Sequence, residues 1–127
     1  MKISAASAPV GRAGVRERQR RDRAVAPAMQ TQYPKLATLQ IDFEFTDTTA
    51  FLPSPQVTVF HPPARAYFCF ACPYSDCDGE FDLTRPVAQM MNARDSHAEG
   101  QMNCAGNKQG GNRCTLCVEY SLVARWT

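Results

Sequence analysis

Six cysteines in 127 residues constrain this chain more than any other feature. They form two groups, Cys69-x2-Cys72-x4-Cys77 and, after an insertion of 26 residues, Cys104-x9-Cys114-x2-Cys117. Two groups of thiols separated by an insertion are typical of a tetrahedral zinc site, to which each group contributes two ligands from a tight turn or hairpin. Thiolates are soft ligands that suit zinc better than a hard cation. The sequence therefore predicts bound zinc.

The choice of four ligands among the six cysteines stays open at this point. Spacing alone favours the two C-x2-C pairs, Cys69 with Cys72 and Cys114 with Cys117. Strand geometry argues against these pairs, because residues three apart in an extended strand point to opposite faces, although a bend would remove the objection. The alternative set, in which a turn and a hairpin loop bring the thiols together, is Cys72, Cys77, Cys104 and Cys114. Mixed sets that include His97 are the remaining choice.

Disulfides are the main rival to a metal, since an even number of cysteines is typical of small exported domains. The N-terminal residues lack the continuous apolar stretch of a secretory signal, so we expect a reducing, cytoplasmic environment. Redox chemistry is disfavoured because both C-x2-C pairs lie in expected strands. The longest apolar run, residues 66 to 72, is far shorter than the roughly 20 residues that span a bilayer, which argues against a membrane protein.

Catalysis is not expected. Hydrolysis by zinc needs an open coordination position and a general base, whereas four thiolates close the site and neutralise the metal. The segment AGNKQGG lacks the ending of a phosphate-binding loop, and no Ser-His-Asp order stands out. The acidic run from 76 to 82 lacks the spacing of a calcium loop. The chain is therefore predicted to be noncatalytic, with no small-molecule substrate evident.

Charge divides the chain into two unlike parts. Residues 1 to 28 carry seven basic and two acidic side chains, a net charge of +5, whereas residues 29 to 127 carry seven basic and ten acidic ones, a net charge of −3. The first part has no aromatic residue and no leucine, so we expect a disordered basic tail, unless the product begins at Met29. Its arginines at 12 to 23 suggest contacts with nucleic acid as one use.

The remaining residues, 29 to 127, are predicted to form a single β-rich zinc-binding domain. Period-2 patterns predict strands at 39 to 45, 56 to 60, 98 to 104 and 113 to 126, and the apolar run at 66 to 71 indicates a more central strand of one sheet. A short helix is expected at about 84 to 95, with Thr84 as its cap. The expected fold class is α+β, mostly antiparallel, with a zinc-ribbon-like knuckle and a β-hairpin.

A resemblance supports one ligand set. The segment CPYSDCDGEFDL, the C-x-G element at 104 to 106 and the C-x5-Y-x-L element at 114 to 122 together resemble a group of small uncharacterised proteobacterial zinc-ribbon-like proteins. The resemblance covers about 65 to 127. It implies that the shared cysteines are Cys72, Cys77, Cys104 and Cys114, with Cys69 and Cys117 as additions in this chain, and it implies no established activity.

We therefore expect a structural zinc module that acts by binding another protein. The net negative charge of residues 29 to 127 disfavours nucleic acid as the partner of the folded part. Nucleic-acid binding through the arginine-rich segment is the alternative hypothesis, and a disulfide-stabilised exported protein is the second alternative.

Overall fold

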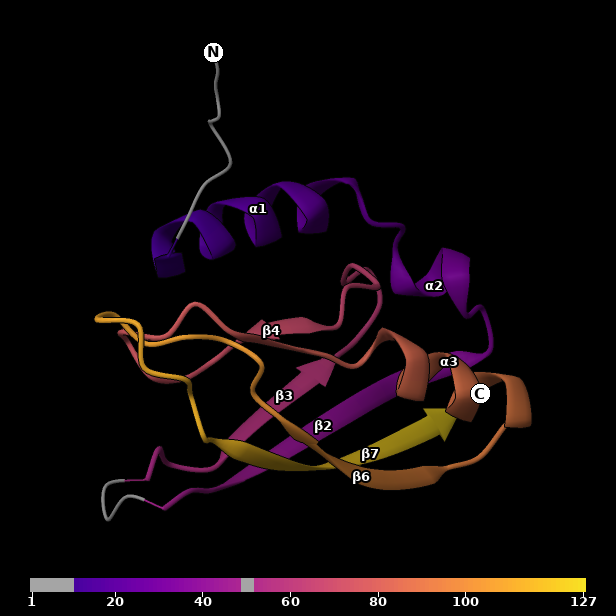
Figure 1. The fold of residues 1–127 in the computed structure, drawn as a ribbon. Coiled ribbons are helices and arrows are strands. Elements are labelled where there is room, and N and C mark those ends of the chain that lie inside the picture. The colour runs from indigo at the N-terminus through magenta and orange to yellow at the C-terminus, as the bar shows by residue number, and fades with distance from the viewer. Residues whose placement is uncertain (1–10, 49–51) are drawn as a thin grey trace.

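The computed structural model describes residues 11–48 and 52–127. In chain order these residues form α1 (Gly11–Val25), α2 (Met29–Gln32), β2 (Leu36–Thr46), β3 (Gln56–Phe60), β4 (Cys69–Ala71), β5 (Glu80–Asp82), α3 (Thr84–Ala93), β6 (His97–Asn103) and β7 (Cys117–Trp126). The elements are arranged in layers, with a large sheet on one side, the small strands and α3 next to it, and α1 outside them (Figure 1). The predicted α+β class with antiparallel sheets is confirmed.

The large sheet has four antiparallel strands in the order β3-β2-β7-β6. Because side chains alternate between the two faces of a strand, β2 directs Leu39, Ile41 and Phe43 to one face, where all three are buried. Ile41 lies opposite Leu122 of β7, which is also buried. One face of this sheet therefore carries the hydrophobic core, as the period-2 pattern predicts.

The second layer covers that apolar face. Within the described residues, strands β4 and β5 pair only with each other, and Phe70 of β4 packs edge-on against Phe43 and Phe60 of the large sheet. Helix α3 contributes Val87, Met90 and Met91 to the same core. The prediction that residues 66 to 71 form a more central strand of one sheet is thus wrong, because the apolar run lies in a two-stranded sheet between the core and α1.

Three helices are present in the described residues, two more than expected. The segment Gly11–Val25 is helical rather than disordered, so the predicted tail is wrong for this part, whereas residues 1–10 lie outside the described structure. Its arginine, alanine and glutamate residues are good helix formers, which outweighs the lack of apolar side chains once the helix has a surface to contact. The short helix α2 buries Met29.

Two boundaries differ from the sequence analysis. Strand β7 begins at Cys117 instead of residue 113, although the hairpin register continues beyond the strand to the bridge between Asn107 and Arg113. Helix α3 begins at Thr84, whose backbone N–H and hydroxyl both donate to the Asp82 carboxylate, so Thr84 is not the cap. In the part of the chain that the structure describes, no helix has the length and hydrophobicity needed to cross a membrane.

Candidate metal centre

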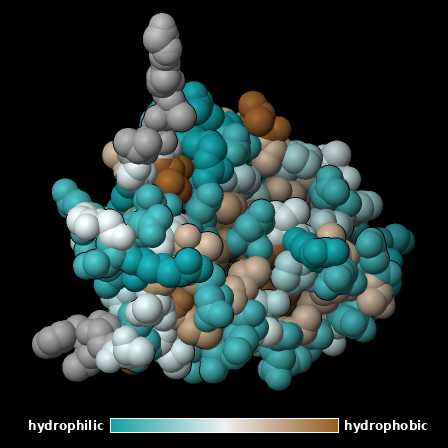
Figure 2. All heavy atoms as spheres, in the orientation of Figure 1, coloured by the Kyte–Doolittle hydropathy of each residue, from teal (hydrophilic) through white to brown (hydrophobic). Residues whose placement is uncertain are grey.

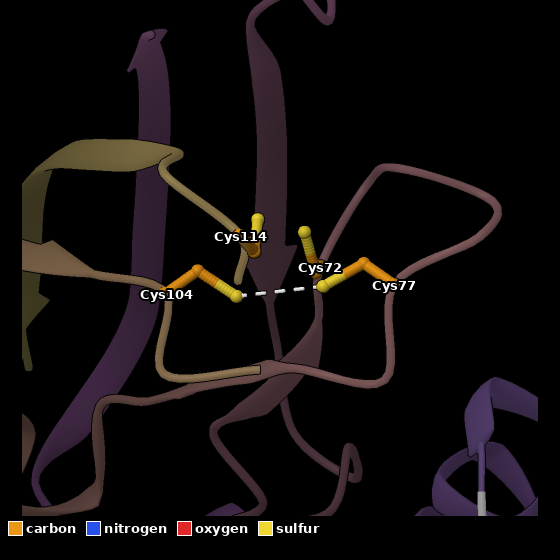
Figure 3. A group of neighbouring side chains, drawn as sticks. All are labelled: Cys72, Cys77, Cys104 and Cys114. Atoms are coloured by element: carbon orange, nitrogen blue, oxygen red, sulfur yellow. Dashed lines mark hydrogen bonds between the residues drawn. The ribbon is translucent and has the colours of Figure 1, made fainter. Parts of the chain in front are cut away.

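Four cysteine side chains meet in the interior, and we refer to Cys72, Cys77, Cys104 and Cys114 as the cysteine cluster. Their sulfurs all lie within 4.8 Å of one another, and all four residues are buried. Figure 3 shows the side chains pointing toward a common centre, two from each of two chain segments, with 3.6 Å between the sulfurs of Cys77 and Cys104. This is the set of four that the resemblance implies.

Each pair of cysteines comes from one connection between two strands. Cys72 follows β4 and Cys77 precedes β5, while Cys104 follows β6 and Cys114 precedes β7. Antiparallel pairing brings the ends of consecutive strands together, so each connection returns its second cysteine to the first. The two connections then face each other across the cluster.

Two C-x-G turns give the centre a repeated local geometry. The backbone N–H of Gly79 donates to the sulfur of Cys77 at 3.3 Å, and the N–H of Gly106 donates to the sulfur of Cys104 at 3.4 Å. Such N–H groups favour the thiolate over the neutral thiol, because they place positive partial charge beside the sulfur. The same N–H groups would therefore support sulfur ligands of a metal ion.

The two turns touch, and glycine makes this close approach possible. A Cβ on Gly106 would lie 2.3 Å from the backbone nitrogen of Gly79, and a Cβ on Gly79 would lie 2.1 Å from the sulfur of Cys104. Neither position has room for a side chain. The C-x-G elements are therefore explained by packing of one turn against the other.

Backbone hydrogen bonds also join the two connections. The N–H of Asp78 donates to the carbonyl of Asn107 at 3.1 Å, and the N–H of Gln109 donates to the carbonyl of Asp76 at 2.7 Å. In the reverse direction, the N–H of Asn107 donates to the carboxylate of Asp78 at 2.7 Å. These bonds fix the distance between the turns that carry Cys77 and Cys104.

Asp47, directly after β2, ties both cysteine connections to the large sheet. Its carboxylate accepts hydrogen bonds from the hydroxyl of Tyr74, at 2.6 Å, and from Thr115. Burial alone would raise the pKa of Asp47, but hydrogen bonds from Thr115, Tyr74 and Thr48 lower it below its ordinary value. The ammonium of Lys108 lies 4.0 Å from the centre of the Tyr74 ring. This network links three separate parts of the chain beside the cysteine cluster.

The donor set fits a tetrahedral thiolate-binding metal. Zinc–sulfur bonds of about 2.3 Å place the four sulfurs of a tetrahedron about 3.8 Å apart, close to the 3.6 Å between Cys77 and Cys104. Burial raises the pKa of Cys104 to about 12 and also raises that of Cys72 in the metal-free protein. A metal ion would displace these protons and neutralise the thiolates.

The other candidates lie outside the cysteine cluster. The thiol of Cys69 donates a hydrogen bond to the Glu80 carboxylate at 2.9 Å. Burial of the thiol is the main reason that its pKa is raised to about 12, and the bond to Glu80 is the second. Cys117 is half-buried at the start of β7. His97 is exposed and lies 3.3 Å from the hydroxyl of Ser121. The structure thus brings neither the second-choice cysteines nor His97 to the four clustered thiols.

Contacts from α1 to the centre have no counterpart in the sequence prediction. Arg12 donates hydrogen bonds to the carbonyls of Cys72 and Tyr74, the second at 2.8 Å. Arg18 pairs with Glu80, and Gln19 donates to the same carboxylate at 2.8 Å. Residues 12 to 24 are mostly good helix formers and include no proline, which could have predicted this helix. Nothing in the sequence indicates where the helix packs.

Comparisons with known proteins give no match, so the functional argument depends on the geometry of the cysteine cluster. No family model matches the chain, and neither a curated protein nor a solved structure is significantly similar to it. The resemblance to small proteobacterial proteins therefore stays a prediction. What the structure establishes is a buried group of four cysteines consistent with a structural metal site.

Proposed function

We propose that the chain is a noncatalytic module in which a structural zinc ion is held by Cys72, Cys77, Cys104 and Cys114, and that the module acts by binding another protein. The observation that carries the metal assignment is the convergence of four buried sulfurs within 4.8 Å of one another. A tetrahedral set of four thiolates is a typical structural zinc site.

A structural role follows from the closed donor set. Four protein ligands leave no coordination position for water or substrate, and the four thiolates offset the positive charge that would acidify bound water. When bound, zinc supplies the cross-link between the two connections. The hydrogen-bonded turns at Gly79 and Gly106 set the position of two of the sulfurs before the metal binds.

The spacing of the cysteine sulfurs supports a metal over disulfides. All six cysteines are free in the structure, and the 3.6 Å between the sulfurs of Cys77 and Cys104 is well beyond a disulfide bond of about 2 Å. A cytoplasmic location fits reduced thiols and belongs to the same proposal.

The proposed action on proteins rests on the uncovered surfaces. One face of the large sheet packs the core, while Val57 and Val59 of the edge strand β3 are 63% and 44% exposed. Apolar side chains on an edge strand with a free backbone are typical contact sites for another chain. A groove of about 460 Å³ on the outer face of the large sheet is lined mainly by polar and acidic residues of β2, β6 and β7, whereas small-molecule sites are lined mainly by apolar side chains.

Native mass spectrometry of the full chain tests the metal assignment. We expect one zinc ion in the parent protein and in a Cys117→Ser variant, and strongly weakened zinc binding in Cys114→Ser, because only Cys114 belongs to the cysteine cluster. The two variants remove the same thiol from positions three residues apart, which makes them a matched pair. A metal-free chain about six mass units light would show three disulfides and would overturn the proposal, as would equal zinc content in the two variants.

A further inference from the structure

A basic trough lies between α1 and β4, and we call it the α1–β4 trough. It encloses about 260 Å³ and is lined by the arginines of α1, by Gln19 and by the three residues of β4: Arg12, Arg16, Arg20, Arg23, Cys69, Phe70 and Ala71. Among the described residues that line it there is no carboxylate, and Glu80 of β5, which accepts hydrogen bonds from the lining residues Gln19 and Cys69, is paired with Arg18. Figure 2 shows mostly hydrophilic side chains along the part of the surface that carries α1. The trough therefore favours a negatively charged occupant.

One wall of the trough is a free strand edge. In the part of the chain that the structure describes, strand β4 pairs with β5 alone. Two hydrogen bonds of 2.9 Å, from the Leu83 N–H to the Phe68 carbonyl and from the Cys72 N–H to the Gly79 carbonyl, show which residues of β4 face β5. In an antiparallel ladder, residues between such bonded positions turn their N–H and C=O groups the other way. Cys69 and Ala71 thus direct these groups away from β5, and in the described part of the chain no bond outside the ladder engages them.

The spacing of the arginines matches that of an extended chain. Four helical residues rise about 6.0 Å, so Arg12, Arg16 and Arg20 follow one another at that interval along α1. Alternate side chains of a β-strand are about 6.7 Å apart. A strand that lies beside β4 would thus present every second side chain to successive arginines.

Arg16 and Arg20 are the most available of these side chains. Both are exposed, and among the described residues Arg16 makes no ion pair while Arg20 contacts only Glu17 of its own helix. Arg12 is already hydrogen-bonded to two carbonyls, and Arg23 lies 5.3 Å from the centre of the Tyr67 ring. Arg16 and Arg20 are therefore the expected partners of carboxylates on a ligand.

We propose that the α1–β4 trough binds an extended peptide of a partner protein in which acidic residues alternate with other residues. The peptide adds a third strand to β4 through the N–H and C=O groups of Cys69 and Ala71, and two of its carboxylates pair with Arg16 and Arg20. Backbone pairing with a sheet edge is a common mode of peptide recognition. This inference rests on the proposed role in protein binding and names the chemistry of the partner.

A peptide fits the trough better than a nucleic acid does. Phosphates alone would account for the arginines, but a phosphodiester backbone has no N–H groups to donate to the carbonyls of Cys69 and Ala71. The short length of β4 limits the pairing to about four backbone hydrogen bonds. We therefore expect modest affinity that falls with rising salt, because the ion pairs are exposed.

Fluorescence anisotropy on the zinc-loaded full chain tests the proposal. The probe is a labelled peptide of alternating glutamate and threonine, E-T-E-T-E-T-E, and the comparison peptide E-E-E-E-T-T-T has the same composition. We expect the alternating peptide to bind at least about five-fold more tightly than the block peptide, and methylation of its alternate backbone amides to remove this advantage. Equal binding of the two peptides would overturn the proposed strand pairing.

Variants of the protein supply the second arm. Arg16→Ala with Arg20→Ala should weaken binding of the alternating peptide at least about five-fold, whereas Arg21→Ala with Arg85→Ala, an equal loss of charge outside the trough, should leave it within about two-fold. The variant Ala71→Pro removes one outward N–H and should weaken binding without loss of zinc. Equal losses in the two double variants would contradict the trough as the site.

Two further outcomes separate this inference from the metal proposal. A single-stranded oligonucleotide of matched charge that displaces the alternating peptide and binds more tightly would replace the peptide with a nucleic acid. Absence of binding by either peptide, with one zinc still bound per chain, would refute the peptide site and leave the metal proposal standing. A folded parent protein that binds no zinc when zinc is supplied would refute the metal proposal instead.

Discussion

The contact between the two C-x-G turns allows a prediction that separates packing from ligand chemistry. In a Gly106→Ala variant the new Cβ would lie 2.3 Å from the nitrogen and 2.4 Å from the Cα of Gly79. Ordinary van der Waals contact begins at 3.4 Å, so the nitrogen is 1.1 Å too close. Both clashing atoms belong to backbone, and no side-chain rotation relieves them. The two turns must therefore move apart, although every cysteine is still present.

The size of this movement sets the expected loss of zinc affinity. Separation of the turns by about 1 Å would displace Cys77 and Cys104 from a tetrahedral site that tolerates deviations of about 0.2 Å in metal–ligand distance. Overpacking a close contact typically costs about 1 to 3 kcal/mol, which corresponds to a dissociation constant for zinc that is roughly 5- to 150-fold larger. We expect a loss within this range.

Competition with a chromophoric chelator at fixed pH measures the dissociation constant for zinc. Gly110→Ala is the matched control, because a Cβ at Gly110 meets nothing within 4 Å. Its φ of +99° strains an alanine locally, so this control should lose some stability and keep its zinc affinity. If Gly106→Ala binds zinc as tightly as the control, the two turns are not held in contact in the way described.

Three further predictions follow from the side-chain network. A Glu80→Gln variant should lower the pKa of Cys69 from about 12 and speed its alkylation in mildly alkaline solution, as read by peptide mass mapping. Because the pKa of Cys69 is raised from 9.0, the free energy of unfolding should fall as pH rises from 9 to 12. In chemical denaturation a Cys69→Ser variant should show a shallower fall with pH than the parent, and an equal fall in both proteins would refute this assignment. The pKa of Asp47 is lowered instead, so its contribution should be present above its ordinary value of 3.8 and be lost at lower pH, and an Asp47→Asn variant should unfold at lower temperature than the parent at neutral pH.

The four members of the cysteine cluster were among the ligand sets predicted from the sequence. Turn spacing around Cys72 and Cys77, together with a hairpin loop between Cys104 and Cys114, brings these thiols together by local geometry. The period-2 pattern continues through residues 113 to 116, where the hairpin register persists although strand β7 begins only at Cys117. Cys114 and Leu116 are buried and Thr115 is exposed, so the alternation of burial extends further than the regular strand does.

The division into two sheets was decided by tertiary packing. Residues 66 to 71 are apolar on both faces, which the sequence analysis attributed to a central strand. In the structure Phe70 faces the core, whereas Cys69 on the opposite face contacts Gln19 and Glu80 beneath α1. A strand that is buried on both faces has the same apolar sequence pattern whether a second sheet or a helix packs against it.

The sequence by itself determined the antiparallel α+β class, the apolar face of β2 and β7, and the group of thiols from which the candidate ligands come, because these depend on alternation and short spacing. Only the tertiary structure decided that α1 is ordered and where it lies. Its contacts, from Arg12 to the carbonyl of Cys72 and from Arg18 to Glu80, join residues about 60 positions apart. The residue that α1 buries is the polar Gln19, so the apolar pattern that reveals core-facing elements could not reveal where the helix docks.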